Sequence, residues 1–451
     1  MDRRDRIGRR VAAVAGVAGL LAAGCGSSSH ASSSTGTTAP AGTAAASASS
    51  AASPTAREVS LPAVPGTISG PGVTADTITI GQITTTTGPI PGLFQDANDG
   101  LDAYAAYVNA NGGLAGHKLK VIHEDDALSC NNYTSDLKDL SSRVFALVGT
   151  FTIEDNCGGA VLKANPELIN IEGEVLDPSL YSSPNTFTPT PIPPGYTTTG
   201  YLWVKQKFPN DITHTAALIP SPSVAPATEQ EITAQSVGYK YVYKRIIGPL
   251  DTNFTSDILR MKNAGVKIVD LGADPIGVIS AFIQQSHQQG LKLDAIISAP
   301  AYDGHLFNLL GDRNLANNLV YSPLLYSLYL GQDRTTNPGL NTFLTWLNKD
   351  HPNEAASIYS VSAWGSGVLF TQALASAGAQ ITQSSTLQAL AHITSFDSGG
   401  LTATFNPGQR KGANCMVIAA VQNGAWTRVY PKSGFDCNGT YLNVPLSEIH
   451  Q

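Results

Sequence analysis

Residues 77–83 read TITIGQI, and this alternation of β-branched and polar side chains predicts a strand. A loop rich in Thr, Gly and Pro follows, and apolar residues at helical spacing then predict a helix over 94–110. Asn111-Gly112-Gly113 ends this helix, and the next strand is expected over 118–124. This order of strand, helix and strand is typical of a parallel sheet.

The same rhythm continues to the middle of the chain. Helices are expected over 133–143 and 157–165, and strands over 144–149 and 168–172. Helices that alternate with strands predict a parallel sheet covered on both faces. The proline-rich residues 177–196 interrupt the pattern, because proline fits neither helix interiors nor central strands. We interpret this segment as a crossing between two lobes.

After the crossing, the rhythm restarts and predicts a second sheet. Strands are expected over 215–219, 240–247, 266–271 and 293–298, and helices over 226–237, 257–264 and 275–289. The last part of the chain is expected to hold helices over 338–350 and 361–378 and short strands over 402–405, 415–421 and 425–430. Asn423-Gly424 predicts that the last two strands form a hairpin.

The predicted fold is therefore α/β, with two doubly wound parallel-sheet lobes joined by crossing hinge segments. The first lobe is expected to contain residues 73–196 and about 325–410. The second lobe is expected to contain residues from about 197 to 324 and from about 411 to 447.

Composition excludes several classes of protein. The chain has 451 residues and a formal net charge of −7, which argues against a nucleic-acid binder. Charged residues make up only 14% of the chain, whereas about 25% is average. No apolar run is long enough to predict a membrane-spanning helix.

The N-terminus predicts export. Arginines precede an apolar stretch over 11–23, which is the pattern of a signal peptide over residues 1–24. Leu21-Ala22-Ala23-Gly24-Cys25 resembles a bacterial lipobox, although Ala22 stands where Leu is usual. We expect Cys25 to be lipidated and residues 25–72, rich in Ser, Ala and Thr, to form a disordered tether. The protein would then lie outside the cytoplasmic membrane, held there by its lipid alone. The alternative is an ordinary secretory signal.

Four further cysteines remain, and an even number suits an exported protein with disulfides. Four cysteines allow three pairings, and the sequence spacing favours the two local ones, Cys130–Cys157 and Cys415–Cys437. A metal site is the weaker alternative, because no C-x-x-C motif occurs and no His lies at ligand spacing from a Cys.

Several motifs, taken in order, resemble those of a known family. They are Thr87-Gly88-Pro89, the VNANGGLAGHKL segment at 108–119, Glu124-Asp125-Asp126, Val148-Gly149-Thr150 and the TNFTSDI segment at 252–258. The chain thus resembles the branched-chain amino-acid (Leu/Ile/Val) binding proteins, which are ABC-transporter substrate-binding proteins with the type I periplasmic-binding-protein fold.

This resemblance implies a monomeric binding protein, without cofactor or catalysis, that closes two lobes on a small molecule and delivers it to a permease. It also implies a disulfide between Cys130 and Cys157. The chain departs from the family at residues 221–226, where relatives often carry Asp-x-x-Tyr-Gly and an aromatic ligand contact.

Ligands of doubly wound sheets bind at the carboxyl ends of the strands, and this rule selects the candidate ligand-binding residues. They are hydroxyl groups, carboxyl groups and one aromatic ring that follow predicted strands: Thr150, Thr152, Glu172, Glu174, Ser221, Ser223, Asp274 and Tyr302. Each has a simpler alternative role in capping or in a solvated loop.

The candidate loops offer hydroxyl and carboxyl groups but no Lys or Arg, so they favour a zwitterion or an amide over a phosphate. The acidic run His123-Glu124-Asp125-Asp126 does not predict a metal site, because alternate side chains of a strand face opposite ways. A ligand sensor with a receptor partner and a secreted hydrolase remain alternatives, although the hydrolase and nucleotide-binding motifs are absent from the sequence.

Overall fold

The computed structural model describes residues 58–191, 194–248 and 250–449. The predicted signal peptide, Cys25 and most of the predicted tether lie outside the described residues. Within these ranges, no helix combines the length and the apolar character needed to cross a membrane.

The described chain begins with a segment that packs on the folded domain. β1 (Thr67–Ile68) pairs in parallel with β13 (Gln380–Ile381). The Val59 amide donates to the Thr342 hydroxyl at 2.8 Å, and the Tyr107 hydroxyl donates to the Val59 carbonyl at 2.8 Å. The prediction of a tether that reaches residue 72 is therefore wrong. Besides this backbone pairing, Ile68 is buried in the core and Leu61 and Val64 pack against it.

The first lobe is built on a five-stranded parallel sheet with the order β3-β2-β4-β5-β6. Its strands are β2 (Thr77–Thr84), β3 (Lys118–Asp125), β4 (Ala146–Thr150), β5 (Ile169–Glu172) and β6 (Thr186–Phe187). The edge strand β6 lies within the proline-rich segment, so that segment is not only a crossing as predicted. A two-residue edge strand tolerates nearby prolines because its outer side needs no ladder hydrogen bonds.

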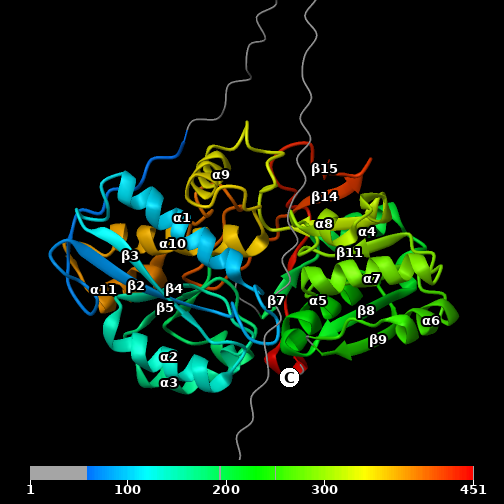
Figure 1. Cartoon of the computed structure of the whole chain (residues 1–451), viewed down its shortest axis with the longest axis horizontal. Coiled ribbons are helices and arrows are strands. Elements are labelled where there is room, and N and C mark those ends of the chain that lie inside the picture. The colour runs from blue at the N-terminus through cyan, green and yellow to red at the C-terminus, as the bar shows by residue number, and fades with distance from the viewer. Residues whose placement is uncertain (1–57, 192–193, 249, 450–451) are drawn as a thin grey trace, which may run out of the picture. The chain divides into compact units, whose positions relative to one another are not determined.

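Helices cover both faces of this sheet (Figure 1). α1 (Gln95–Ala110) and α10 (Ile358–Ser376) pack together on one face, whereas α2 (Cys130–Arg143) and α3 (Gly159–Ala164) cover the other. α1 and α10 approach closely at Gly100, where a Cβ atom would lie 2.2 Å from the Ser360 carbonyl oxygen. α9 (Pro338–Asp350) lies beside α1, and α11 (Gln383–His392) lies beside α10.

The second lobe contains a seven-stranded sheet with the order β15-β14-β12-β11-β10-β8-β9. Its strands are β8 (Thr215–Pro220), β9 (Tyr241–Ile247), β10 (Ile268–Asp270), β11 (Ala295–Ile297), β12 (Val320–Leu324), β14 (Val417–Gln422) and β15 (Ala425–Tyr430). The predicted hairpin at Asn423-Gly424 is confirmed, and it joins β12 in antiparallel pairing, so the sheet is mixed at this edge. Residues 402–405 form no strand and make only isolated bridges to Tyr326 and Phe396.

Helices also cover both faces of the second sheet. α4 (Thr199–Lys207) and α5 (Val224–Ser236) share a core with Ile268, whereas α6 (Thr255–Asn263) and α7 (Ile276–Gln288) share one with Val269. α8 (Leu306–Leu310) follows α7 along the chain and packs against it. Short 3₁₀ turns lie at Asp155–Cys157, Pro178–Leu180, Asp211–Thr213, Ser221–Ser223, Arg313–Ala316 and Leu446–Glu448.

Crossing segments join the lobes, as the sequence predicts. The chain leaves the first lobe after β6, returns after β12 and crosses again before β14. β7 (Gly195–Thr197) lies in the first crossing and pairs in antiparallel fashion with β16 (Tyr441–Asn443) near the C-terminus. The predicted α/β class with two doubly wound lobes is thus confirmed, while the exact limits of each lobe stay a prediction.

Candidate ligand-binding site

A cavity lies between the two lobes, where the carboxyl ends of strands from both sheets meet. The first lobe contributes Phe151 after β4 and Glu174 after β5, and the second contributes Ser223 after β8 and Asp274 after β10. The space open to the centres of water molecules is about 180 Å³, whereas one water needs roughly 10–15 Å³ on this measure. The cavity therefore has room for a small organic molecule, at the place where doubly wound sheets bind ligands.

The cavity wall is largely apolar. On the first-lobe side, the rings of Phe94, Phe151 and Tyr359 contact one another with centroid distances of 5.0–5.6 Å. On the second-lobe side, the wall contains six prolines: Pro220, Pro222, Pro226, Pro275, Pro300 and Pro323. Such a wall suits the apolar body of a ligand, and it makes each polar group on it costly to leave unpaired.

Asp274 is a buried polar group of this kind. Its side chain is 1% exposed, and neither carboxyl oxygen has a hydrogen-bond partner among the described residues. Burial, with a smaller contribution from Asp270, raises the pKa of Asp274 well above its usual value. The Arg and Lys side chains of the described residues do not line the cavity, so no protein cation on this wall compensates a negative charge on Asp274.

Glu174 is a second carboxyl group on the cavity wall. Its surface is open to the cavity, but protein atoms enclose the cavity on most sides. Burial, and then the charge of Asp155, raises the pKa of Glu174 to about 7. Near neutral pH, this group can therefore accept a hydrogen bond as a carboxylate or donate one as an acid.

The structure brings three of the predicted site residues together on the cavity wall: Glu174, Ser223 and Asp274. The other five do not line it. The Thr152 hydroxyl donates to Asp126, and Glu172 is buried and accepts a hydrogen bond from Asn170 at 2.6 Å. Tyr302 is fully buried, with its hydroxyl bonded to Gln332. Of the remaining two, Thr150 is fully buried within its strand and Ser221 is exposed.

Several residues that line the cavity are not among the site residues predicted from the sequence. Tyr359 and Ser362 come from the start of α10, and Tyr326 follows the unpredicted strand β12. These tyrosines place aromatic rings on the cavity wall, although residues 221–226 lack the aromatic residue that relatives often carry there. No local motif marks them, because their place depends on the packing of elements distant in the sequence.

The polar residues at the end of β3 hold loops in place. Asp126 accepts from the Thr85 hydroxyl at 2.7 Å and also from Thr152. Asp125 accepts from the Thr86 amide at 2.9 Å. His123 lies 2.9 Å from Asp102, away from this pair of contacts. The side chains thus point to different partners, as strand alternation predicts.

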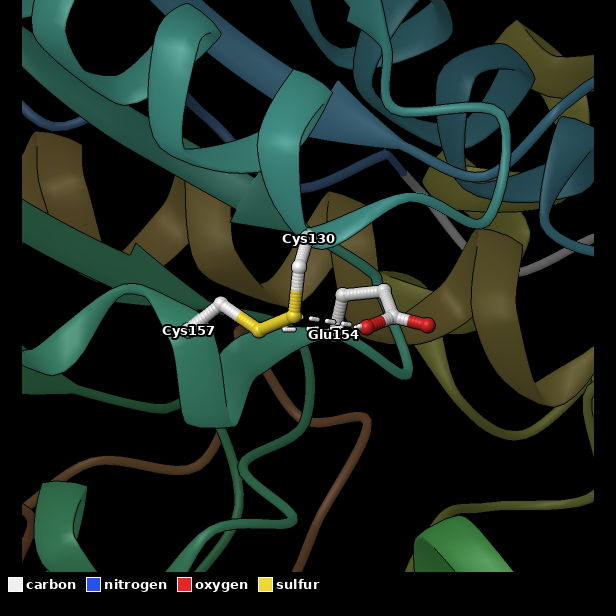
Figure 2. Close-up of side chains that lie close together, drawn as sticks. All are labelled: Cys130, Glu154 and Cys157. Carbon is white, nitrogen blue, oxygen red and sulfur yellow. Dashed lines mark hydrogen bonds between the residues drawn. A yellow bond between two sulfur atoms is a disulfide. The ribbon is translucent and has the colours of Figure 1, made fainter.

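Both predicted disulfides, Cys130–Cys157 and Cys415–Cys437, are present in the structure. Figure 2 shows the first, which joins the start of α2 to the turn after β4, with Glu154 beside it. Glu154 Oε2 lies 3.1 Å from Cys130 Sγ, but the sulfurs are bonded to each other and provide no thiolate for a metal. The bond restrains the loop that carries Phe151 and Ile153 into the cavity.

A charged cluster links the lobes outside the cavity. Asp96 at the start of α1 lies near Asp303 and His305 of the second lobe, and their potential ligand atoms are within 4.8 Å of one another. His305 Nδ1 is 3.0 Å from Asp303 Oδ1, and this hydrogen bond raises the pKa of His305 to about 9. A cationic His305 at neutral pH therefore faces a carboxyl group of the opposite lobe.

Comparison with known proteins agrees with this geometry. The family model described as "Periplasmic binding protein" matches residues 77–425. No curated protein sequence matches the chain. The similarity to solved structures is therefore informative about the fold.

Three similar structures are proteins of ABC transporters. A fatty acid ABC transporter substrate-binding protein from Thermomonospora curvata has a TM-score of 0.66 and 16% identity, and the match covers 80% of this chain and 93% of that one. A branched-chain amino acid ABC transporter protein from Thermus thermophilus with bound valine has a TM-score of 0.66 and 16% identity, and the match covers 79% of this chain and 96% of that one. A solute-binding protein from R. palustris in complex with 4-hydroxybenzoate has a TM-score of 0.64 and 18% identity, and the match covers 78% of this chain and 96% of that one.

Two facing doubly wound lobes, a cavity at their strand ends and a family match across most of the described residues lead to one conclusion. The chain belongs to the periplasmic binding protein family and has the type I fold.

Proposed function

We propose that this protein is a lipid-anchored solute-binding protein outside the cytoplasmic membrane. It captures an amino acid or a related amide between its two lobes and delivers it to the permease of an ABC transporter. It acts as a monomer without a cofactor, and it catalyses no reaction. Hinge motion about the crossing segments closes the lobes on the ligand.

The unpaired carboxyl group of Asp274 is the observation that carries this proposal. A buried acid without a partner costs free energy in the empty protein, and a ligand that brings an ammonium or amide N–H group removes that cost. Glu174 offers a second acceptor in the same cavity. Both groups disfavour phosphates, whose charge would lie beside acids with no compensating cation.

The rest of the cavity suits the other parts of such a ligand. Ser223 and Ser362 supply hydroxyl groups for a carboxylate or a carbonyl oxygen. The amides at the start of α5 and α7 also lie at this edge of the sheet, and helix N-termini favour negative charge. The aromatic cluster of Phe94, Phe151 and Tyr359 would contact an apolar side chain.

The relatives support a ligand with an apolar body. One is named for a fatty acid, one has bound valine and one is in complex with 4-hydroxybenzoate. Each of these molecules joins an apolar part to a polar end. Among them, the amino acid also supplies a cation for Asp274, which is why we favour it.

A thermal-shift panel of amino acids, amino-acid amides, polyols and phosphates tests the ligand class. An amino acid or an amide at one hundred times its dissociation constant should raise the free energy of unfolding by about 2.7 kcal/mol. Phosphates should give no shift. Stabilisation by phosphates alone would reject the proposal.

Replacement of the anchoring cysteine tests the location. Cys25→Ser is expected to move the protein from the membrane fraction to the soluble extracytoplasmic fraction, because the substitution removes the residue that carries the proposed lipid anchor. Ser27→Ala serves as the control and should leave the protein in the membrane fraction. A Cys25→Ser protein that still fractionates with membranes would show that the lipid anchor is the wrong assignment.

A further inference from the structure

A second cavity adjoins the first on the side of the crossing segments. It is lined by Gly195 and Thr197 of β7, Tyr441 of β16 and Glu229 of α5, and we call it the hinge chamber. The space open to water-molecule centres is about 130 Å³. The chamber shares several lining residues with the first cavity: Glu174, Thr190, Tyr196, Pro226, Gln230 and Leu325. The shared lining shows that the two spaces are neighbours.

Glu229 provides a buried carboxyl group on the wall of the hinge chamber. Its side chain is 1% exposed, and its Oε2 atom accepts a hydrogen bond from the Gly195 amide at 3.1 Å. The Tyr181 hydroxyl lies beside the same carboxyl group. The Oε1 atom has no hydrogen-bond partner among the described residues. Glu229 is thus a second buried acid with an unused acceptor, placed at the wall of a cavity.

The two cavities together present three carboxyl groups and, within the described residues, no cation on their walls. Asp274 belongs to the first cavity, Glu229 to the hinge chamber, and Glu174 to both. The apolar wall of prolines and aromatic rings belongs to the first cavity. Acceptors at two places, with an apolar surface adjoining them, are complementary to a molecule with donors at both ends and an apolar middle.

We propose that the two cavities form one elongated site, in which Asp274 receives one amine or amide group of the ligand and Glu229 receives a second. This inference rests on the proposed function, because it assigns a narrower ligand class to the same site. The ligand is then a two-ended amine or amide, such as a diamine or a diamino-acid amide. A molecule with a carboxylate at its second end would place that negative charge beside Glu229.

Protons provide a signature of such binding. Burial raises the pKa of Glu229 to about 8, so the group is mostly protonated in the empty protein at pH 7. An ammonium group beside it favours the charged carboxylate, and the proton leaves as the cation binds. A diamine that reaches both acids should therefore release more protons per molecule bound than a monoamine of the same chain length.

Calorimetry on the purified full chain tests the inference with matched probes. Diamines from 1,3-diaminopropane to 1,8-diaminooctane are each compared with the monoamine and the ω-amino acid of the same chain length. For at least one length, the diamine should bind about tenfold or more tightly than the monoamine, and the ω-amino acid should bind less tightly than the diamine. Titrations in two buffers of different ionisation enthalpy should show the additional proton release.

Variants assign the effect to the hinge chamber. Glu229→Gln keeps an acceptor for the Gly195 amide but cannot become a carboxylate, and it should remove most of the advantage of the diamine over the monoamine. Glu231→Gln is the matched control on the same helix, where Glu231 contacts Lys244 Nζ at 2.7 Å. This variant should retain the full advantage. If Glu229→Gln does not fold, proton release by the wild-type protein still decides the question.

The outcomes separate the two proposals. If monoamines bind but diamines gain no affinity and release no further protons, the two-ended site is rejected and the proposed function stands. If the ω-amino acid binds more tightly than the diamine, the two-ended site is also rejected. If no probe with an amine or amide group binds, the proposed recognition by Asp274 fails together with this inference.

Discussion

Replacing Asp274 with asparagine is expected to weaken binding of an amine-bearing ligand by at least about 30-fold. Truncating one partner of a buried, hydrogen-bonded charge pair typically costs about 2–5 kcal/mol, and every 1.4 kcal/mol corresponds to a factor of about ten. Asp274 is 1% exposed and has no hydrogen-bond partner in the described protein, so an ammonium group that binds there would lose the carboxylate that it contacts.

The same substitution is expected to stabilise the empty protein. Because burial raises the pKa of Asp274 well above its usual value, folding at neutral pH forces this group to take up a proton. Asparagine has the same shape and needs no proton. The free energy of unfolding at pH 7 should therefore rise by about 1 kcal/mol or more.

Calorimetry for affinity and urea unfolding for stability measure both effects. Asp294→Asn is the matched control, because Asp294 belongs to the same lobe, is exposed and lies 3.7 Å from Lys267. That variant should change neither quantity appreciably. Unchanged ligand affinity in Asp274→Asn would mean that the ligand's donor binds elsewhere.

The ligand-free protein should be more stable at pH 5 than at pH 8. Burial raises the pKa of Glu172 and of Glu229 to about 8, and that of Glu174 to about 7. In the unfolded chain, a glutamic acid titrates near pKa 4.3. Between these values the folded state holds protons that the unfolded chain has released, so stability falls as the pH rises.

Each fully buried group contributes a slope of up to about 1.4 kcal/mol per pH unit in this range. His305 acts in the same direction: its folded-state pKa is raised to about 9, so the stability it contributes is lost as the pH rises towards that value. Asp125 has the opposite effect, because the stability that it contributes is lost as the pH falls, and it has this effect only at lower pH. Burial alone would raise its pKa, but hydrogen bonds from Thr87 and neighbouring amides lower it to about 2.

Urea unfolding at several pH values between 5 and 8 checks this prediction. Glu229→Gln should flatten the profile by the slope of one group, whereas Glu231→Gln should leave it unchanged. A stability that increases with pH over this range would contradict the assignment of protonated acids to the interior.

The sequence predicts the parallel core well because its signal is local. β2 begins with alternating burial, β4 and β8 are short runs buried at every position, and α1 has buried residues at helical spacing. The limits of these elements in the structure differ little from the expected ones. β12 and α4 are not predicted from the sequence, because the residues that pack around them come from distant segments of the chain. β12 is buried between β11 and the hairpin that arrives almost one hundred residues later.

The residues of the candidate site are also only partly predictable from the sequence. The rule that ligands bind at strand ends selects the edge at which the cavity lies, and it names Glu174, Ser223 and Asp274, which line that cavity. It cannot say which way a loop side chain turns. A register shift between Val148 and Thr150 disturbs the end of β4, and Thr152 turns inward to Asp126. The rule also cannot find residues such as Tyr359, which reach the cavity from a helix rather than from a strand end.

The repeated crossing of the chain between lobes has a consequence for how the molecule folds. α10 covers the sheet built mainly from residues 77–172, although it starts at Ile358, and the hairpin that completes the second sheet ends at Tyr430. The first sheet lacks its covering helix α10, and the second lacks its last two strands, until most of the chain is present. Such long sequence separations slow folding, and a chain cut short before the hairpin would leave β12 as an open edge for aggregation. The lobes are expected to unfold as one cooperative unit, although each resembles a separate domain.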